Sequence, residues 1–435
     1  MPVLTGRYLC GNFLGDPVIS WPCDPVNDGG SRFEATTEAR ELSPGVTGTF
    51  QSHLCEETDP TIMYDFVVVG VGPPGARFAR RAAEAGYEVL ALEKGRVGRP
   101  LACSGHVSTD IWDYVPETAK QRLFQNRIYG ARFHTGGPDS RSYPFYKDSE
   151  VSNVIDRVEL DRTLADCARE AGAEVREGHT VTGMTEHEDH VRLDVRLADD
   201  LAVDAGLQDT DPGGTAQVTA RMVAGCDGPN SKVRSGAGLP EPDELLHGVL
   251  AFESEPDHGD RVDVHLTAPE FFAWRIPRGD AGTEYGLGAP PGTDVSAMFD
   301  RLTDEYDVTT ANVCSGVIPV GPPSEVTGRR TFLVGDAAAQ TKPFTGGGIL
   351  YSMTAADIAA AEIDPREPAS LERYETAWRE DLSREIQLGH WLRRCYSLPK
   401  PIQQFGLRTL SGEIGVHMDR PSTLFSREQL KQLFS

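Results

Sequence analysis

Residues 64–94, YDFVVVGVGPPGARFARRAAEAGYEVLALEK, contain the feature that most restricts how this chain can fold. The β-branched run at 66–69 predicts a buried parallel strand. Three glycines follow it, Gly70, Gly72 and Gly75, in the spacing GxGxxG. The first permits a tight turn, the second lets the backbone approach a pyrophosphate, and the third lets a helix pack on the strand. We therefore expect a helix near 75–85 whose first amides face a phosphate group.

A carboxylate completes this unit. Residues 88–92 predict a second strand, and Glu93 follows Gly70 by 23 residues, close to the spacing of a carboxylate that binds a ribose. An acidic residue at this position fits a free 2′-hydroxyl, as in FAD or NAD. The strand, the helix, the second strand and the acid together predict a Rossmann-like dinucleotide-binding domain.

Two later segments favour FAD over NAD. In RMVAGCDGPNSKVR (221–234) a short strand ends before Asp227-Gly228, and Ser231 opens a helix. In RTFLVGDAAAQTKPFTGGGILYSMTAADIAAA (330–361) a strand at 332–334 ends in Gly335-Asp336, and the glycines 346–348 open a long helix. An aspartate at a strand end can hold ribityl hydroxyls, and consecutive glycine amides at a helix start can approach a flavin ring or a phosphate.

These three segments in this order resemble the aromatic-hydroxylase-like class of FAD proteins. Within that class the chain resembles the geranylgeranyl reductase family, of the archaeal digeranylgeranylglycerophospholipid reductase type. PLACSGHVS (100–108) is similar to the family's Cys-Gly-Glu-Gly-like loop, with Ser104 where glycine is common. VIDRVELDRTLADCAREAGAEV (154–175) matches a helix and strand of the family. PEFFAWRIP (269–277) resembles its Pro-x-x-Tyr-x-Trp-x-Phe-Pro motif, with Phe272 replacing the tyrosine and Ile276 the phenylalanine.

The resemblance implies an α/β fold in three parts. Residues 63–235 and 326–365 would form a discontinuous FAD-binding domain, residues 236–325 an inserted antiparallel substrate-binding sheet, and residues 366–435 a helical C-terminal region. Residues 1–62 show no helical or strand period, so we expect a disordered extension, with translation starting at Met63. The alternative is a genuine tail or a docking arm that uses Cys10, Cys23 and Cys55.

The resemblance also implies the site residues. FAD contacts would fall at Gly75, Glu93, Cys103, Ser104, His106, Arg157, Val181, Asp336, Gly348 and Ile349. Arg157 would pair with the pyrophosphate, Val181 would touch adenine, and Asp336 would bind ribityl oxygens. Cys103 and His106 are the candidate catalytic residues, because the family's cysteine lies by flavin and substrate and a histidine can supply a proton. The competing interpretations are a buried apolar thiol and a loop histidine bound to the backbone.

The stretch 269–277 predicts a strand with proline at each end. Alternation places Phe272, Trp274 and Ile276 on one face, and Phe271, Ala273 and Arg275 on the other. We expect the first face to line an apolar tunnel for a polyprenyl chain, which offers only methyl and alkene surface. Ordinary core packing is the alternative.

The resemblance thus implies an FAD-dependent reductase that saturates geranylgeranyl chains of archaeal ether-lipid precursors. One alternative is an FAD-dependent monooxygenase of an aromatic or isoprenoid compound, and another is a flavoprotein that binds prenyl lipid without turnover. YGLGAPPG (285–292) is interpreted as a strand and a turn, so no separate nicotinamide domain is visible. Ferredoxin, reduced nicotinamide and reduced deazaflavin all fit as electron donors, and the missing domain favours ferredoxin.

Charge restricts the partners and the compartment. A net charge of −24 argues against nucleic-acid binding. Only seven of the 42 basic residues are lysines, which together with the acidic excess favours a halophilic protein; a mesophilic protein with an unusually acidic surface is the alternative. No apolar run of about 18 residues is present, and the cysteines lack metal-ligand spacing, so we expect a cytoplasmic protein without metal. HWLRRCYSLPK (390–400) predicts either peripheral membrane contact or a helix packed on the body; its relevant side chains are Trp391, Arg393, Arg394, Tyr396 and Lys400.

Overall fold

A computed structural model describes residues 63–99, 103–198, 214–412 and 419–422. The expectations for residues 1–62, including the disordered extension and the three cysteines there, lie outside the described residues. No helix of the described part of the chain is both long and apolar enough to span a bilayer.

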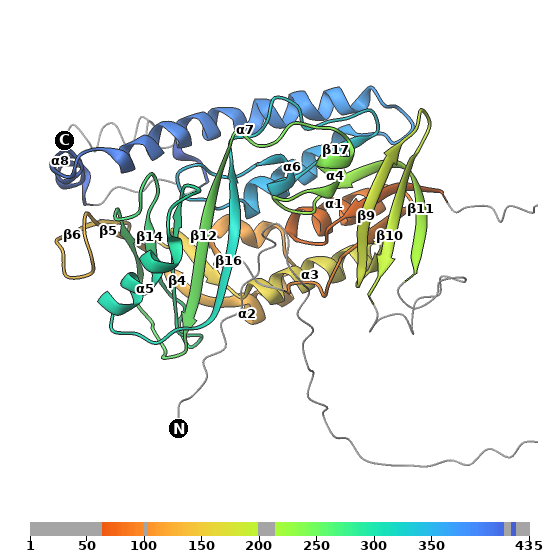
Figure 1. Cartoon of the computed structure of the whole chain (residues 1–435). Coiled ribbons are helices and arrows are strands. Elements are labelled where there is room, and N and C mark those ends of the chain that lie inside the picture. The colour runs from red at the N-terminus through yellow and green to blue at the C-terminus, as the bar shows by residue number, and fades with distance from the viewer. Residues whose placement is uncertain (1–62, 100–102, 199–213, 413–418, 423–435) are drawn as a thin grey trace, which may run out of the picture. The chain divides into compact units, whose positions relative to one another are not determined.

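The first sheet brings together the three segments singled out in the sequence (Figure 1). Its order is β8-β2-β1-β11-β10-β9, with β17 also paired to β11. The strands are β1 (Met63–Val69), β2 (Val89–Leu92), β8 (Glu174–Arg176), β9 (His179–Glu186), β10 (Val191–Leu197), β11 (Thr215–Gly225) and β17 (Thr331–Leu333). The long β11 pairs antiparallel with β10 through its first half and parallel with β1 and β17 through its last residues. Because the carboxyl ends of parallel strands meet at one sheet edge, all three glycine- and aspartate-containing turns meet there.

Helices α1 (Pro73–Glu84), α3 (Arg157–Glu170) and α6 (Ile349–Glu362) pack with this sheet, and α1 contacts both of the others. Phe78 of α1 makes edge-to-face contacts with Phe66 and Phe332, at centroid distances of 5.2 and 5.1 Å. These rings join β1, α1 and β17 in one core, so aromatic packing fixes the glycine turn against the third segment. The predicted strands at 66–69 and 88–92 and the helix between them are confirmed.

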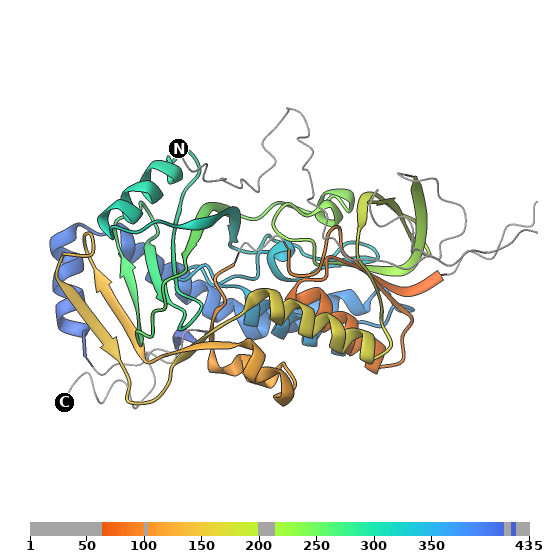
Figure 2. The same cartoon turned by 90° about the horizontal axis from the view of Figure 1, so that it is seen from below.

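The second sheet has the order β16-β12-β15-β14-β13-β5-β6. Figure 2 shows its orange strands, from the earlier part of the chain, beside its green ones. Its strands are β5 (Gly130–His134), β6 (Ser142–Tyr146), β12 (Glu244–Glu253), β13 (Arg261–His265), β14 (Ala273–Pro277), β15 (Thr283–Ala289) and β16 (Ala311–Val320). The sheet extends beyond the expected segment 236–325, because β5 pairs parallel with β13 and brings β6 with it. All its other pairs are antiparallel. A third sheet, β3-β7-β4, consists of β3 (His106–Ser108), β4 (Phe124–Ile128) and β7 (Ser152–Ile155).

Strand β14 starts later than the sequence suggests. Glu270 has a φ of 56°, so the chain turns there and is extended only from Ala273 onward. Phe272, Trp274 and Ile276 share one apolar cluster as expected, while Ala273 packs on the other face with Leu287 and Phe299. Phe271 was expected on the face of Ala273, but it joins the cluster of Phe272 because it precedes the strand. The stretch 285–292 is β15 followed by a turn, as predicted.

The remaining helices are α2 (Lys120–Leu123), α4 (Lys232–Gly236), α5 (Val295–Glu305), α7 (Ser370–Arg394) and α8 (Lys400–Leu410). Helix α5 covers the face of the second sheet that carries Ala273. The long α7 passes along both sheets and leads to α8 (Figure 1). The helical C-terminal region that the sequence predicts is therefore present in the part described.

Candidate functional site

In the GxGxxG turn, Gly70 and Gly75 are tightly packed, whereas Gly72 has open space beside it. Gly70 has a φ of 93°, and a Cβ there would lie 2.4 Å from the Cys226 carbonyl oxygen. A Cβ at Gly75 would lie 2.0 Å from the Gly70 carbonyl oxygen. At Gly72, by contrast, a Cβ would have no protein atom within 4 Å. The protein itself does not need a glycine at 72, so this gap at the start of α1 fits an incoming pyrophosphate.

Glu93 is fixed beside this turn. Its carboxylate accepts hydrogen bonds from the Val71 amide at 2.9 Å and from the Gly95 amide at 3.3 Å. The carboxylate thereby spans the turns that follow β1 and β2, the position from which a ribose hydroxyl is bound in dinucleotide domains.

Arg157 carries a buried charge that is only partly satisfied. Its Nη2 donates to both carboxylate oxygens of Asp161, at 2.8 and 2.9 Å, while its buried Nε has no partner among the described residues. Burial disfavours the charge, but the carboxylates of Asp161 and Asp336 raise the pKa of Arg157. A permanently charged guanidinium with a free buried donor fits an anionic cofactor group.

Asp336 lies beside the N-terminus of α6. A Cβ at Gly348, which precedes α6, would lie 3.1 Å from the Asp336 Oδ1. Burial raises the pKa of the Asp336 carboxyl to about 6, although the positive charge of Arg157 acts against this rise. Burying the charged carboxylate is costly, and a hydrogen bond from a hydroxyl group would reduce that cost. A ribityl chain supplies such hydroxyl groups.

Replacing Asp336 with asparagine should stabilise the protein without cofactor and weaken its binding of FAD. The pKa of this carboxyl is higher in the folded protein than in the unfolded chain. The free energy of unfolding is therefore unaffected below about pH 4 and falls as the pH rises from about 4 to about 6. At pH 7.5 we expect Asp336→Asn to add on the order of 2 kcal/mol to the unfolding free energy of apoprotein, with no gain at pH 4. FAD affinity should fall about tenfold, because a charge-assisted hydrogen bond is lost.

Urea unfolding at both pH values and a fluorescence titration with FAD would check this expectation. Asp113→Asn, at an exposed carboxylate of the described surface, is the matched control. Equal stability of Asp336→Asn and wild type at pH 7.5 would contradict it.

The Cys103–His106 loop is held in one conformation. Gly105 has a φ of 74°, and a Cβ there would lie 2.3 Å from the Ile155 carbonyl oxygen. The Ser104 Oγ accepts from the His106 amide at 3.2 Å, and the His106 Nε2 lies 2.8 Å from the Ser152 Oγ. Burial and the charge of Lys342 lower the pKa of His106 to about 4. The imidazole is therefore neutral at pH 7 and acts as a hydrogen-bonding group rather than as an imidazolium acid.

A buried network joins this loop to the second sheet. Arg278 donates from Nη1 to the Ser104 carbonyl oxygen at 2.9 Å and to the Glu284 Oε2 at 3.0 Å. Glu284, which has no exposed surface, also accepts from the Trp274 Nε1 at 2.8 Å. The indole lies against Gly286, where a Cβ would be 2.3 Å from the ring. Trp274 is thus fixed relative to the Cys103 loop through a chain of charged hydrogen bonds.

The apolar cluster of the second sheet touches the glycine turn before α6. A Cβ at Gly346 would lie 3.1 Å from the Phe271 Cζ and 3.5 Å from the Ile318 Cδ1. Phe272, Trp274 and Ile276 belong to the same cluster, as does Val154, whose backbone pairs with His106. The cluster therefore lies between the two elements expected to contact a flavin.

The structure gives the packing of two expected cofactor residues, Val181 and Ile349, and of Asp227, which follows β11. Val181 is the third residue of β9, and its side chain lies in the core of the first sheet. Ile349 begins α6 and packs partly on that core. Asp227 caps α4, because its carboxylate accepts from the Ser231 hydroxyl and the amides of Lys232 and Val233.

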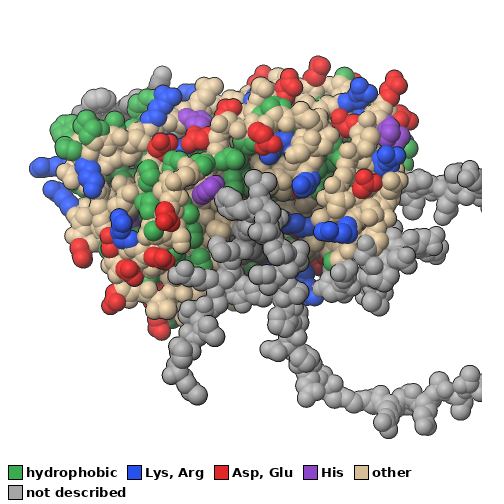
Figure 3. Space-filling model, viewed as in Figure 1, with side chains coloured by type: hydrophobic (Ala, Val, Ile, Leu, Met, Phe, Trp, Pro, Cys, Tyr) green, Lys and Arg blue, Asp and Glu red, His purple; other side chains and the backbone are tan. Residues whose placement is uncertain are grey.

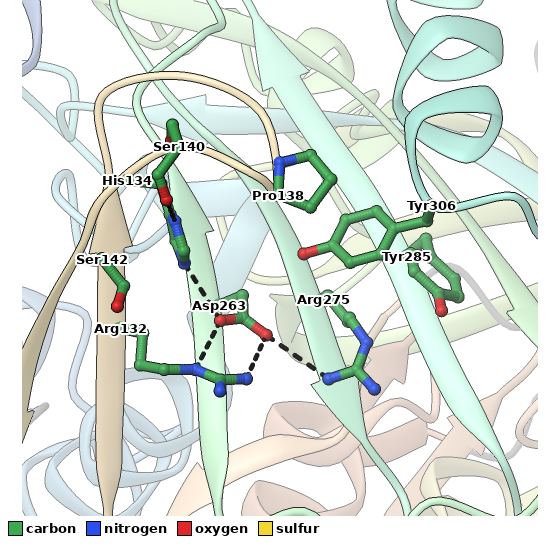
Figure 4. A pocket seen from close by; sticks show the side chains of 9 residues that line it. All are labelled: Arg132, His134, Pro138, Ser140, Ser142, Asp263, Arg275, Tyr285 and Tyr306. Atoms are coloured by element: carbon green, nitrogen blue, oxygen red, sulfur yellow. Dashed lines mark hydrogen bonds and ion pairs between the residues drawn. The ribbon is translucent and has the colours of Figure 1, made fainter.

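A polar pocket lies on the other face of the second sheet (Figure 4). Its cavity is about 450 Å³, and Asp263 stands at its centre between Arg132 and Arg275. Arg132 donates to both oxygens of Asp263 at 2.7 Å, and His134 lies 3.2 Å from one of them. These groups satisfy one another and lie opposite the cluster of Phe272, so the pocket is separate from the cofactor site.

Sequence reasoning missed Lys342, Arg278 and Glu284, which are all buried near the site. Two of them could have been found in the sequence as charged residues whose neighbours are mostly apolar or glycine. Lys342 directly precedes PFTGGG, and Glu284 begins the run EYGLGA. Such positions are costly to bury, which marks them for inspection.

Comparisons with known proteins agree with this geometry. An FAD-binding domain model matches residues 63–270. Digeranylgeranylglycerophospholipid reductase 1 of Methanococcoides burtonii is 30% identical over 355 residues, 74% of this chain and 81% of the relative. The reductase of the same name from Methanosarcina acetivorans is 29% identical over 77% of this chain and 85% of its own length.

Solved structures share the fold. A geranylgeranyl bacteriochlorophyll reductase-like protein of Thermoplasma acidophilum aligns with a TM-score of 0.71 at 23% identity, over 86% of this chain and 96% of the other. The flavin-dependent brominase Bmp2 aligns with a TM-score of 0.61 at 16% identity, over 85% of this chain and 99% of the other. From the sequence relatives, this chain belongs to the digeranylgeranylglycerophospholipid reductase family.

Proposed function

We propose that this protein is an FAD-dependent reductase that saturates the double bonds of geranylgeranyl chains in archaeal ether-lipid precursors. The observation that carries the proposal is the apolar cluster of β14 placed against the glycine turn before α6, in a chain whose relatives are named for this reduction. A prenyl chain held there would lie next to the cofactor.

The residues of this chain supply binding, orientation and protection from water. Gly72, Glu93, Arg157 and Asp336 would hold FAD, which when bound provides the hydride for an alkene carbon. An isolated alkene has no polar group that a hydrogen bond could hold. The apolar side chains of Phe272, Trp274 and Ile276 would therefore align the prenyl chain and exclude water. Cys103 would stand beside the reacting carbon as the proton source, with neutral His106 positioning the loop through Ser152.

An anaerobic turnover experiment tests the function. The protein is reduced with dithionite in high salt, a digeranylgeranyl glycerolipid is added, and flavin absorbance and lipid mass are followed. We expect the flavin to reoxidise while the lipid gains about two mass units per saturated bond, from one hydride and one proton. Reoxidation only on admission of air, with unchanged lipid, would refute the proposal.

The monooxygenase alternative is not favoured. The flavin-dependent brominase Bmp2 is only 16% identical to this chain, so its similarity shows the fold alone. The sequence relatives near 30% identity are named as reductases. For the electron donor we propose ferredoxin, with reduced nicotinamide or deazaflavin as the other outcomes of a donor assay. Its support is that 285–292 forms β15 and a turn rather than a second nucleotide loop.

We also propose a cytoplasmic protein with peripheral contact at the inner face of the membrane. Among the described residues, five of the six exposed large apolar side chains lie between 391 and 410: Trp391, Leu398, Ile402, Phe405 and Leu410. Exposed Arg394, Lys400 and Arg408 accompany them, and apolar and basic side chains gather at the α8 end of Figure 3. Apolar side chains rimmed by cations suit an anionic lipid surface.

Two residues expected to join this contact face inward instead. Arg393 is buried and donates to Glu244 at 2.8 Å and to the Glu270 carbonyl oxygen at 3.0 Å. Tyr396 donates to the Phe344 carbonyl oxygen at 2.8 Å. Both side chains bury polar groups that have hydrogen-bond partners on the body, which offsets the cost of burying them.

Substituting Ile402→Ser with Phe405→Ser should weaken binding to anionic vesicles at least tenfold. Each fully inserted side chain of this size contributes about 1.5–3 kcal/mol. Vesicle sedimentation in high and low salt measures the effect. Arg122→Gln, at an exposed arginine on α2, serves as control. Equal sedimentation of the double variant and wild type would show that this surface does not meet lipid.

A further inference from the structure

Lys342 is a buried lysine in the turn that leads to α6. Its backbone amide donates to the Gly347 carbonyl oxygen at 2.9 Å, and its carbonyl oxygen accepts from the Gly346 amide at 2.8 Å. Its side chain runs along the same turn, since a Cβ at Gly347 would lie 3.1 Å from the Lys342 Cε and 3.3 Å from its Nζ. The side chain is 5% exposed. A positive charge is therefore held against Gly347, the middle residue of the triple glycine.

A second expected cofactor element lies near the same charge. Lys342 is close enough to His106 for its charge to contribute, after burial, to the lowered pKa of that imidazole. His106 starts β3 directly after the Cys103 loop. The ammonium thus acts electrostatically on both sides of the proposed flavin site, the glycine turn and the Cys103–His106 loop.

Asp419 fixes the ammonium from the C-terminal segment. The Lys342 Nζ donates to the Asp419 Oδ1 at 2.6 Å, and the Asp419 carbonyl oxygen accepts from the Tyr351 hydroxyl at 2.8 Å. Ser422 of the same segment donates from its amide to the Glu385 Oε2 on α7 at 3.0 Å. Burying an ion pair gains little net stability, because desolvation opposes the attraction. Stability alone therefore does not explain a buried ion pair at this turn.

We propose that Lys342, oriented by Asp419, is the fixed positive charge that favours the reduced, anionic form of the bound flavin. The inference rests on the proposed function, which places FAD against the turn that opens α6. Two-electron reduction of FAD takes up two electrons and one proton at neutral pH and leaves one negative charge on the flavin ring. A nearby cation in a water-poor site stabilises that charge more than it stabilises the neutral oxidised ring.

The test measures the two-electron reduction potential of the bound flavin and the dissociation constants of oxidised and reduced FAD. Lys342→Met should weaken binding of reduced FAD relative to oxidised FAD at least tenfold, which makes the potential about 30 mV more negative. Lys342→Arg keeps the charge and should retain most of the wild-type potential. Asp419→Asn removes the opposing charge and should shift the potential in the positive direction.

Arg420→Gln is the matched control, because it breaks the partly exposed pair of Arg420 with Asp381 in the same segment and leaves Lys342 paired. Its potential should equal that of wild type. If Lys342→Met does not fold, the double variant Lys342→Met with Asp419→Asn removes the pair together, and its potential should lie below that of Asp419→Asn alone.

The sign of the shifts separates the outcomes. Shifts in the same direction for Lys342→Met and Asp419→Asn, or unchanged potentials in both, would overturn the inference and assign the pair a structural role. Failure of the wild type to bind FAD would instead refute the proposed function, since no potential could then be measured.

Discussion

Gly72→Val is expected to abolish FAD binding while leaving the protein folded. A Cβ at Gly72 has no protein atom within 4 Å, and the residue's φ of −72° is open to any amino acid. The new side chain would fill the gap that fits the pyrophosphate at the start of α1. We expect affinity for FAD to fall at least roughly 100-fold, a loss of about 2.7 kcal/mol. The unfolding free energy of apoprotein should fall by only about 1 kcal/mol, because valine is a poorer N-cap than glycine.

Gly75→Ala is the contrasting variant. A Cβ there would lie 2.0 Å from the Gly70 carbonyl oxygen, so α1 must move away from β1. This variant should lose several kcal/mol of stability with or without FAD. Fluorescence titration with FAD and thermal unfolding of apoprotein distinguish the two variants. Wild-type affinity in a folded Gly72→Val protein would show that the cofactor does not approach this turn.

The sequence predicts local elements well here because their determinants lie close together in the chain. The run FVVVGVGPPG contains a strand, a turn and a helix start within ten residues, and β1 and α1 form there. The same holds for the strand before Gly335-Asp336 and for the helix that opens after the triple glycine. Gly70 and Gly75 are required by a positive φ or a close approach, which the sequence spacing already encodes.

The long-range contacts could not be predicted, because they depend on how distant segments pair. Arg278 reaches Ser104 across 174 positions, and Lys342 reaches Asp419 across 77. The parallel pairing of β5 with β13 likewise joins residues 130–134 to a sheet expected to begin near 236. Alternation in a single strand shows which residues share a face, but not which strand lies beside it.

The expected FAD residues came from the resemblance to a family, and the structure adds the surroundings of several of them. Arg157 and Asp336 interact electrostatically although they lie far apart in sequence. For Val181 the resemblance predicted a contact with adenine but not the burial of its side chain in the core. The sequence does not show whether such a valine would contact a cofactor through its side chain or through its backbone. The neutral state of His106 could not be predicted from the sequence either, because its lowered pKa results from burial and from the charge of Lys342.

Glu284→Ala is expected to be the most destabilising single change in the second sheet. The substitution leaves the Arg278 guanidinium and the Trp274 indole N–H buried without their acceptor. Removing one partner of a buried ion pair costs about 3–5 kcal/mol, since the remaining charge is neither solvated nor paired. Arg278 would also lose the group that holds it against the Ser104 carbonyl oxygen, so the Cys103 loop should become more mobile.

Chemical denaturation and hydrogen exchange of the loop amides measure the two effects. Glu253→Ala is the matched control, because Glu253 accepts from the Tyr285 hydroxyl at 3.1 Å in the adjacent strand and is only partly buried. It should cost about 1 kcal/mol and leave the exchange of residues 104–106 unchanged.

The double variant Glu284→Met with Arg278→Met separates charge from shape. It replaces both buried charges with apolar side chains of similar length, so it should recover most of the stability lost in Glu284→Ala. It should not restore slow exchange at Ser104, because no donor then reaches that carbonyl group. A cost below about 1 kcal/mol for Glu284→Ala would mean that water replaces the missing carboxylate. Trp274 would then not be fixed to the Cys103 loop through this network, and the orientation of the prenyl chain would depend on apolar packing alone.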